Sequence, residues 1–191
     1  MKFSAVILAG GKSSRMGRDK AWLLLDGKPL LARQIALVRE LAPEEIFISG
    51  RACVDYSLFG YRVLMDRYPD AGPLAGIAAG LEASSSPLVL VLAVDMPDMT
   101  SGALRRLLER CTPGVGIVPR VNHRVEPLAA YYPKAAQTIA ADMLSRGLRE
   151  VRTFVEECKR SRLLSFHDFE AGELHYFANW NAPADLPLPD V

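Results

Sequence analysis

The sequence predicts an α/β protein with a mostly parallel central sheet, for two reasons. Short apolar runs alternate with segments of helical spacing through the first ~120 residues, the order in which strands and crossover helices build such a sheet. Residues 88–94 are almost continuously aliphatic, which is typical of a central strand covered on both faces. Because 50% of the 191 residues are hydrophobic, the chain can bury a substantial core, and we expect a single domain over residues 1–191.

The N-terminal part begins with a strand, a loop and a helix. Residues 5–8 form a short apolar run that Gly10 and Gly11 end, which predicts a buried strand followed by a tight turn. Apolar residues at helical spacing predict a helix over 32–41. A proline and the apolar run at 45–49 then indicate a loop and a second strand.

The middle of the chain continues this alternation. Large and β-branched residues favour a strand at 61–65, and a stretch of small residues after it favours a helix at 74–83. The aliphatic strand at 88–94 follows. A helix over 101–110 is expected next, with Ser101 as its N-terminal cap.

The C-terminal part gives weaker signals. We expect a strand at 116–118, an edge strand at 127–132 that tolerates its proline, and a helix at 135–144. Two further segments fit helix and strand equally well, namely residues 151–155 and 162–166. The last elements expected are a short strand at 177–180 and a terminal helix that Pro183 opens.

Composition and charge narrow the classes of protein. The formal net charge is +1, so the chain lacks a strongly basic body for nucleic acid, and phosphate binding must come from local clusters of cations. The three cysteines lie far apart without C-x-x-C spacing, which argues against a disulfide framework or structural zinc and fits a reducing cytoplasm. The opening apolar run stops at Gly10, too short for a signal peptide or membrane span, so we expect a cytoplasmic protein without a membrane partner.

Three segments with unusual chemistry each follow an expected strand directly. They are residues 10–20, 66–76 and 95–97. The carboxyl ends of parallel strands meet at one edge of a sheet, and ligands of open α/β sheets bind outside that edge. We therefore expect the three segments to converge on a single site.

The segment at 8–20, L-A-G-G-K-S-S-R-M-G-R-D-K, carries the strongest functional signal. Its glycines let backbone N–H groups approach an anion while four cations surround them, which indicates a triphosphate. Arg15 and Lys20 are the expected phosphate ligands, because a guanidinium binds two oxygens at once and an ammonium acts as a point charge. The spacing fits neither a P-loop, whose earlier glycine would fall at Val6, nor G-x-G-x-x-G, whose second glycine would fall at Lys12.

Asp95 directly follows the aliphatic strand. A buried carboxylate without a partner is costly, so Asp95 should either accept hydrogen bonds from the next loop or coordinate a hard cation. Beside a triphosphate, magnesium is usually held by one or two carboxylates, which makes Asp95 the leading candidate for a Mg²⁺ ligand. Asp66 either helps Asp95 to hold the ion or contacts the sugar or base of the nucleotide. No Ser-His-Asp or Cys-His pattern supports covalent catalysis.

The glycine-rich segment resembles the L-A-G-G-x-x-x-R-M-G-x-D-K signature of the molybdenum cofactor guanylyltransferases, within the wider sugar-nucleotidyltransferase-like group. Further matching segments follow in the family's order: G-K-P-L at 27–30, G-P-L-A-G at 72–76, D-M-P at 95–97, P-L-A-A-Y at 127–131 and N-W-N-A-P at 179–183. The resemblance therefore spans nearly the whole chain. The chain departs from the family's pattern at Ser49 and Ala182, where relatives often carry asparagine and threonine.

The resemblance implies a three-layer Rossmann-like nucleotidyltransferase fold, in which about residues 1–100 bind nucleotide and the C-terminal part binds the acceptor. It implies transfer of GMP from GTP to molybdenum-molybdopterin, with release of pyrophosphate and formation of the guanine dinucleotide cofactor. The implied partners are therefore GTP and molybdenum-molybdopterin, together with the upstream cofactor synthase and the acceptor molybdoenzymes or their chaperones.

The resemblance also assigns roles to individual residues. The implied nucleotide-binding residues are Leu8, Ala9, Gly10, Gly11, Lys20, Asp66 and Asp95. The first three face the guanine, Asp66 faces the nucleoside, and Asp95 contacts both the nucleotide and Mg²⁺. The predicted catalytic residues are Arg15, Lys20 and Asp95. Asn179 and Asn181 match the family's asparagines on the pterin side.

Two other functions stay open on the sequence alone. One is a cytidylyltransferase for molybdopterin or another phosphorylated small molecule, and the other is a noncatalytic nucleotide-binding carrier module, since a binding loop alone does not prove chemistry. Related cytidylyltransferases tend to read L-A-A-G in the first loop, so Gly10 favours guanine by leaving room beside the base. A Rossmann dehydrogenase is a distant third, because its glycine spacing is absent.

Overall fold

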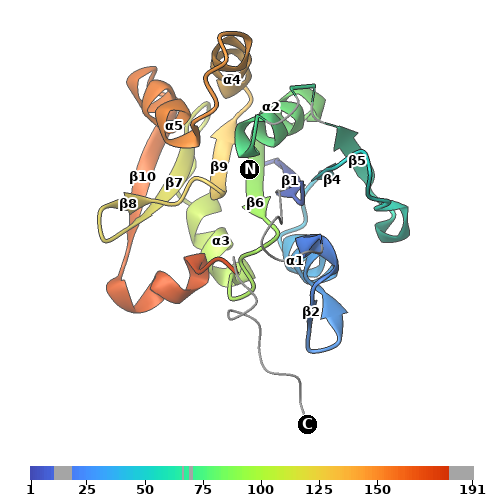
Figure 1. The fold of residues 1–191 in the computed structure, drawn as a ribbon. Helices are drawn as coiled ribbons and strands as arrows, with labels where there is room; N and C mark the ends of the chain where they lie inside the picture. The colour runs from blue at the N-terminus through green and yellow to red at the C-terminus, as the bar shows by residue number, and fades with distance from the viewer. Residues whose placement is uncertain (11–18, 66, 69–70, 181–191) are drawn as a thin grey trace.

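A mixed, mostly parallel sheet forms the centre of the molecule (Figure 1). The computed structural model describes residues 1–10, 19–65, 67–68 and 71–180. Within these residues, one eight-stranded sheet has the order β10-β7-β9-β6-β1-β4-β5, with β8 paired to β7. Its strands are β1 (Ser4–Leu8), β4 (Glu45–Gly50), β5 (Arg62–Met65), β6 (Leu88–Ala93), β7 (Gly116–Val121), β8 (Arg124–Val125), β9 (Ala129–Pro133) and β10 (Leu164–Phe169). Strands β2 (Leu24–Leu25) and β3 (Lys28–Pro29) form a separate antiparallel pair.

The strands that lead to the predicted site run parallel to one another. β1 pairs with β4 on one side and with β6 on the other, and β5 continues the sheet beyond β4. Every residue of β1 and β6 is buried, as expected for aliphatic strands covered on both faces. The predicted α/β fold with a mostly parallel sheet is confirmed.

Strand β9 corrects one prediction. The sequence placed a strand at 127–132 on an edge of the sheet, but β9 lies inside the sheet, antiparallel to both β6 and β7. Pro127 precedes the strand and Pro133 ends it, so the residues between them keep their backbone N–H groups for pairing on both sides. The edge positions belong to β5 and β10.

Helices cover both faces of the sheet and give the molecule its three layers (Figure 1). One face carries α1 (Leu30–Arg39) and α3 (Ser101–Leu108), and the other carries α2 (Pro73–Ala83), α4 (Ala136–Ser145) and α5 (Val151–Arg160). Each face has its own cluster of buried apolar side chains. Helix α2 lies close against β1, because a Cβ at Gly80 would fall 2.6 Å from a methyl group of Val6.

The structure corrects one helix cap and resolves the two ambiguous segments. Thr100, and not Ser101, caps α3, since its hydroxyl accepts the N–H of Ala103 at 3.2 Å. Ser101 is already the first helical residue, and its hydroxyl bonds Glu40 instead. Residues 151–155 are helical in α5, and residues 164–166 belong to β10.

The strand predicted at 177–180 is wrong. Residues Ala171–Phe177 form a 3₁₀ helix, η3. Glu170 and Glu173 form a capping box at its N-terminus. Phe177 at its end is buried against Phe169 of β10, with ring centroids 5.1 Å apart, so the chain leaves the sheet here. The terminal helix predicted from Pro183 lies outside the described residues.

Among the described helices, none is long and apolar enough to cross a membrane. The three cysteines are free thiols: Cys53 is exposed, and Cys111 and Cys158 are buried. Burial raises the pKa of the two buried thiols to about 12, which keeps them protonated and unreactive at neutral pH.

Candidate active site

The carboxyl ends of four parallel strands meet at one edge of the sheet. In the ladders, Leu8 pairs with Ser49 and with Ala93, and Gly50 pairs with Met65. The segments that were predicted to carry chemistry begin directly after β1, β5 and β6. The parallel register therefore brings the ends of these strands to the same edge, where ligands of open α/β sheets bind.

Lys20 and Asp95 meet at this edge. The Nζ of Lys20 lies 2.6 Å from Oδ2 of Asp95, although the two residues are 75 positions apart in the sequence. The side chains are only 13% and 19% exposed, respectively. Charged groups so poorly hydrated need a close partner of opposite sign, which each supplies to the other. Two residues that were predicted independently, one from the first loop and one from the aliphatic strand, are thus in direct contact.

Hydrogen bonds from distant segments fix the loop that carries Asp95. The backbone N–H of Trp180 donates to the carbonyl of Asp95 at 3.0 Å. Gln34, buried on α1, donates its side-chain N–H to the carbonyl of Met96 at 2.6 Å. The backbone that carries the Asp95 carboxylate is therefore held at the end of β6 by both helix α1 and the C-terminal segment.

The two residues at the end of β1 and directly after it pack into the core. Leu8 is 9% exposed and Ala9 is 1% exposed, and they belong to the core clusters on opposite faces of the sheet. Gly10 is partly exposed. A Cβ at Gly10 would make only ordinary contacts, 3.6 to 3.8 Å from Gly50 and Arg51, so among the described residues none requires glycine there.

The C-terminal segment reaches the same edge. Asn179 is exposed and immediately precedes Trp180, whose backbone bonds Asp95. One of the two predicted acceptor residues is therefore placed close in the chain to the Asp95 contact.

The start of α2 also follows the predicted pattern. Gly72 has φ 68° and ψ −157°, a conformation that favours glycine, and Pro73 takes the first helical position. Four further predicted site residues, Gly11, Arg15, Asp66 and Asn181, lie outside the described residues.

Two residues beside the site were not predicted. The carboxylate of Asp19 accepts the backbone N–H of Ala21 at 2.9 Å through Oδ1 and the hydroxyl of Tyr56 at 3.1 Å through Oδ2. Asp19 carries a local signal, because an aspartate immediately before a helical turn is a common cap. Tyr56 carries none, since its contact depends on how β4 is placed beside β1. Burial, followed by the negative charge of Asp19, raises the pKa of Tyr56 well above its ordinary value, so its hydroxyl is a donor at neutral pH.

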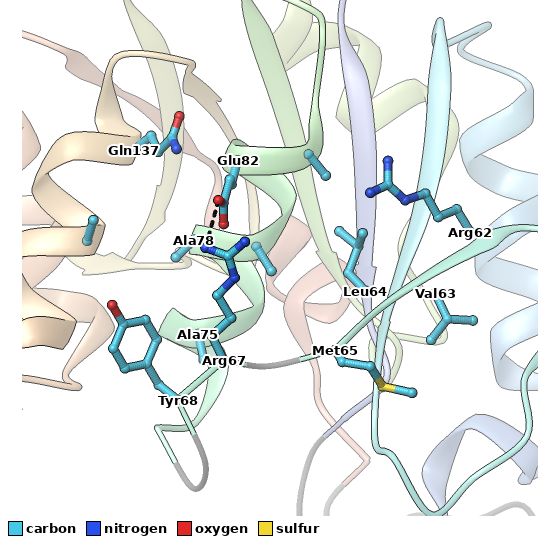
Figure 2. Close-up of a pocket in the computed structure, with 13 residues that line it drawn as sticks. Arg62, Val63, Leu64, Met65, Arg67, Tyr68, Ala75, Ala78, Glu82 and Gln137 are labelled. Atoms are coloured by element: carbon cyan, nitrogen blue, oxygen red, sulfur yellow. Dashed lines mark ion pairs between the residues drawn. The ribbon is translucent and has the colours of Figure 1, made fainter.

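A groove of about 520 Å³ lies elsewhere, between the edge strand β5 and helices α2 and α4 (Figure 2). Figure 2 shows Arg67 and Glu82 facing each other there, with their ion pair at 2.9 Å and Tyr68 and Gln137 nearby. Arg67, Tyr68 and Ala75 of the segment at 66–76 line this groove, whereas Lys20 and Asp95 do not.

A metal site made of protein side chains alone is absent from the described part of the chain, where no cluster of three His, Cys, Asp or Glu residues occurs. Asp95 is a single carboxylate at the strand edge. This donor set suits an ion that takes most of its ligands from a bound phosphate and water, as Mg²⁺ commonly does.

The chain has the α/β fold of the nucleotidyltransferases, with a mostly parallel central sheet. The solved 2-C-methyl-D-erythritol 4-phosphate cytidylyltransferase of Thermus thermophilus shares this fold, with a TM-score of 0.71 over 94% of this chain and 93% of that one, at 21% identity. More narrowly, the chain belongs to the MobA-like NTP transferase domain family, whose model matches residues 5–161.

Relatives support this membership over almost the full length. A protein of Opitutus terrae named "Probable molybdenum cofactor guanylyltransferase" is 39% identical over 95% of this chain and 92% of its own length. The solved molybdopterin-guanine dinucleotide biosynthesis protein A of Archaeoglobus fulgidus is 25% identical, with a TM-score of 0.71 over 95% of this chain and 94% of its own.

Proposed function

We propose that this chain is a molybdenum cofactor guanylyltransferase, which transfers GMP from GTP to molybdenum-molybdopterin and releases pyrophosphate. The observation that carries the proposal is the close pairing of Lys20 with Asp95 at the carboxyl edge of the sheet, in a member of this family. The proposed substrates are those implied by the names of relatives of similar length.

Transfer needs no protein nucleophile. An oxygen of the acceptor's terminal phosphate attacks the α-phosphorus of GTP, the bond from that phosphorus to the bridging oxygen breaks, and pyrophosphate leaves with the electron pair. Lys20, helped by Arg15 of the same loop, neutralises the charge that accumulates on the leaving oxygens. Positioning and electrostatics then supply most of the rate acceleration.

Asp95 is the residue that would hold Mg²⁺, together with phosphate oxygens of the nucleotide. When bound, the ion supplies positive charge to the phosphates and helps to orient them. Asp66 is the residue assigned to the nucleoside. The guanine lies against the backbone at residues 8–11, where Gly10 has no side chain that would stand beside the base.

The acceptor binds on the C-terminal side of the same edge. Asn179 and Asn181 flank Trp180, whose backbone N–H bonds the carbonyl of Asp95. Residues that recognise the pterin would therefore be tied directly to the loop that carries the metal ligand. The nucleotide-binding and acceptor-binding parts act as one domain in this proposal.

The test is release of pyrophosphate by the purified chain mixed with Mg²⁺, molybdenum-molybdopterin and either GTP or CTP. We expect pyrophosphate and the guanine dinucleotide with GTP, and less than about a tenth of that rate with CTP. Lys20→Ala should lose the activity and Lys2→Ala, at an exposed position, should keep it.

The outcomes separate the alternatives. A preference for CTP would identify a cytidylyltransferase instead. Binding of GTP without any release of pyrophosphate would identify a carrier module.

A further inference from the structure

The turn that carries Lys20 is held by a side chain from outside the glycine-rich loop. Residues Lys20–Trp22 form a short 3₁₀ helix, η1, which Asp19 caps through its Oδ1. The second carboxylate oxygen of Asp19 accepts the hydroxyl of Tyr56, which lies 37 residues further along the chain. The residue next to Lys20 is therefore bonded on both oxygens.

Tyr56 itself has little freedom to move. It is 1% exposed, and its ring packs on the backbone at the end of β4. A Cβ at Gly50 would fall 2.4 Å from Cε2 of the Tyr56 ring, so the close approach requires glycine at that position. The backbone N–H of Arg51 donates to the Tyr56 hydroxyl at 3.5 Å. The hydroxyl thus has a fixed location relative to the edge of the sheet.

A second contact joins the same two segments. Trp22, at the end of η1, packs on Phe59 with ring centroids 5.0 Å apart, and Ala21 between Lys20 and Trp22 is fully buried. The segment after β4 therefore holds η1 at both of its ends. Lys20 is the first residue of this turn, and its side chain points toward Asp95.

We propose that Tyr56 is a positioning residue, which fixes Asp19 and through it aims the Lys20 ammonium at Asp95 and the phosphates. The part that concerns phosphate rests on the proposed function, while the geometry of Lys20 does not. An Asp19 carboxylate that loses the Tyr56 hydroxyl bond keeps only the bond from the Ala21 N–H. Trp22 stays packed on Phe59, so the turn remains in place while its first residues, Asp19 and Lys20, gain freedom to move.

The test that needs no nucleotide is the rate at which the Lys20 amine is acetylated by acetic anhydride, followed by peptide mass spectrometry. Tyr56→Phe removes only the hydroxyl and should raise the Lys20 rate about fivefold, because a hydrogen bond of this kind shifts a local equilibrium by about that factor. Tyr61→Phe, a change of the same chemistry on the next tyrosine, should leave the rate unchanged. An unchanged Lys20 rate in Tyr56→Phe would overturn the proposal.

Two internal references distinguish positioning from general loosening. Lys2, whose side chain is 77% exposed, gives the acetylation rate of an accessible amine, to which the other rates are normalised. The amine of Lys134 bonds three carbonyls, so its acetylation rate reports general opening of the fold. The Lys134 rate should not change in Tyr56→Phe. A parallel rise at Lys134 would show a structural role only and would overturn the proposal.

A double variant tests the route through Asp19. In an Asp19→Ala background, Tyr56→Phe should add nothing further to the Lys20 rate, because the hydroxyl then has no carboxylate to hold. An additional increase of the same size in both backgrounds would contradict a route through Asp19.

The same variant has a catalytic readout. With GTP, Mg²⁺ and acceptor, Tyr56→Phe should lower kcat about tenfold and change the KM for GTP by less than about threefold. The reason is that Lys20 stabilises the charge that develops in the transition state more than it stabilises bound GTP. Failure of the unaltered chain to release pyrophosphate would overturn the proposed function and leave the acetylation result to decide the role of Tyr56.

Discussion

The amine of Lys134 offers a test of the fold that is independent of function. It donates to the backbone carbonyls of Leu81, Glu82 and Ser84, the last two at 3.0 and 2.8 Å. These carbonyls lie at the C-terminal end of α2, where a helix has acceptors without partners and a partial negative charge. Lys134→Met keeps the apolar stem and removes the charged donor.

The expected loss can be worked from these contacts. Hydrogen bonds to a charged group contribute roughly 1.5–3 kcal/mol, and the partial exposure of the Lys134 site favours the lower part of that range, about 2 kcal/mol. For a chain of this length, 1 kcal/mol lowers Tm by about 2–4 °C, so Lys134→Met should lower Tm by about 4–8 °C.

The assay is thermal unfolding followed by circular dichroism, with urea unfolding as a second measure of the free energy. Lys2→Met is the matched control, because Lys2 makes one exposed ion pair with Glu44 at 3.2 Å, a kind of pair that contributes about 0–1 kcal/mol. Equal losses in the two variants would show that Lys134 does not stabilise the end of α2.

Three further predictions concern charge and the site. The backbone N–H of Ser85, with two hydroxyl donors, holds the pKa of Glu45 below its ordinary value of 4.5, so its stabilisation is present above that pH and is lost as pH falls through the lowered value. Glu45→Gln should therefore lower Tm at pH 7, and the deficit should shrink in thermal scans below pH 4.5. Gly10→Ala should leave Tm unchanged, because the added methyl meets only ordinary contacts, and should weaken GTP binding about tenfold relative to CTP in parallel titrations. Asp95→Ala and Lys20→Ala should each lower the rate of pyrophosphate release about a hundredfold or more while the far-ultraviolet circular dichroism spectrum is kept.

Each of these has its own contrary result. A Glu45→Gln deficit that grows toward low pH would mean that the carboxylate is not stabilised by its bonds to Ser85. An unchanged preference between GTP and CTP in Gly10→Ala would show that the base does not bind beside that residue. Near-normal turnover in either Asp95→Ala or Lys20→Ala would defeat the catalytic assignment.

The parts of the fold that the sequence predicted are those with a strong local cause. Strand β6 is recognisable because six consecutive buried positions are aliphatic, and α2 because Pro73 follows a glycine that permits positive φ. The juxtaposition of Lys20 and Asp95 followed from topology alone, since both come after parallel strands that are neighbours in the sheet.

The parts that were missed depend on contacts between distant segments. β9 was placed at an edge because Pro127 was counted inside it, and only the pairing with β6 and β7 shows where it begins. The 3₁₀ helix that ends at Phe177 has a local capping box between Glu170 and Glu173, but the packing of Phe177 on Phe169 is visible only in the structure.

The site shows the same limit. The sequence identified the charges but not the side chains that aim them. Tyr56 bonds Asp19 across 37 residues, and Gln34 bonds the carbonyl of Met96 across 62. Neither residue type has a pattern of spacing that would mark it, so both contacts emerged only from the packed structure.

A crystal structure with GTP and Mg²⁺ bound would show whether Lys20 and Asp95 hold the nucleotide and its metal ion. We expect density for the triphosphate against the first loop, with the Lys20 amine on phosphate oxygens and the metal ion on the Asp95 carboxylate. Nucleotide bound elsewhere, for example in the groove beside Arg67 and Glu82, with Lys20 and Asp95 still paired to each other, would contradict this expectation.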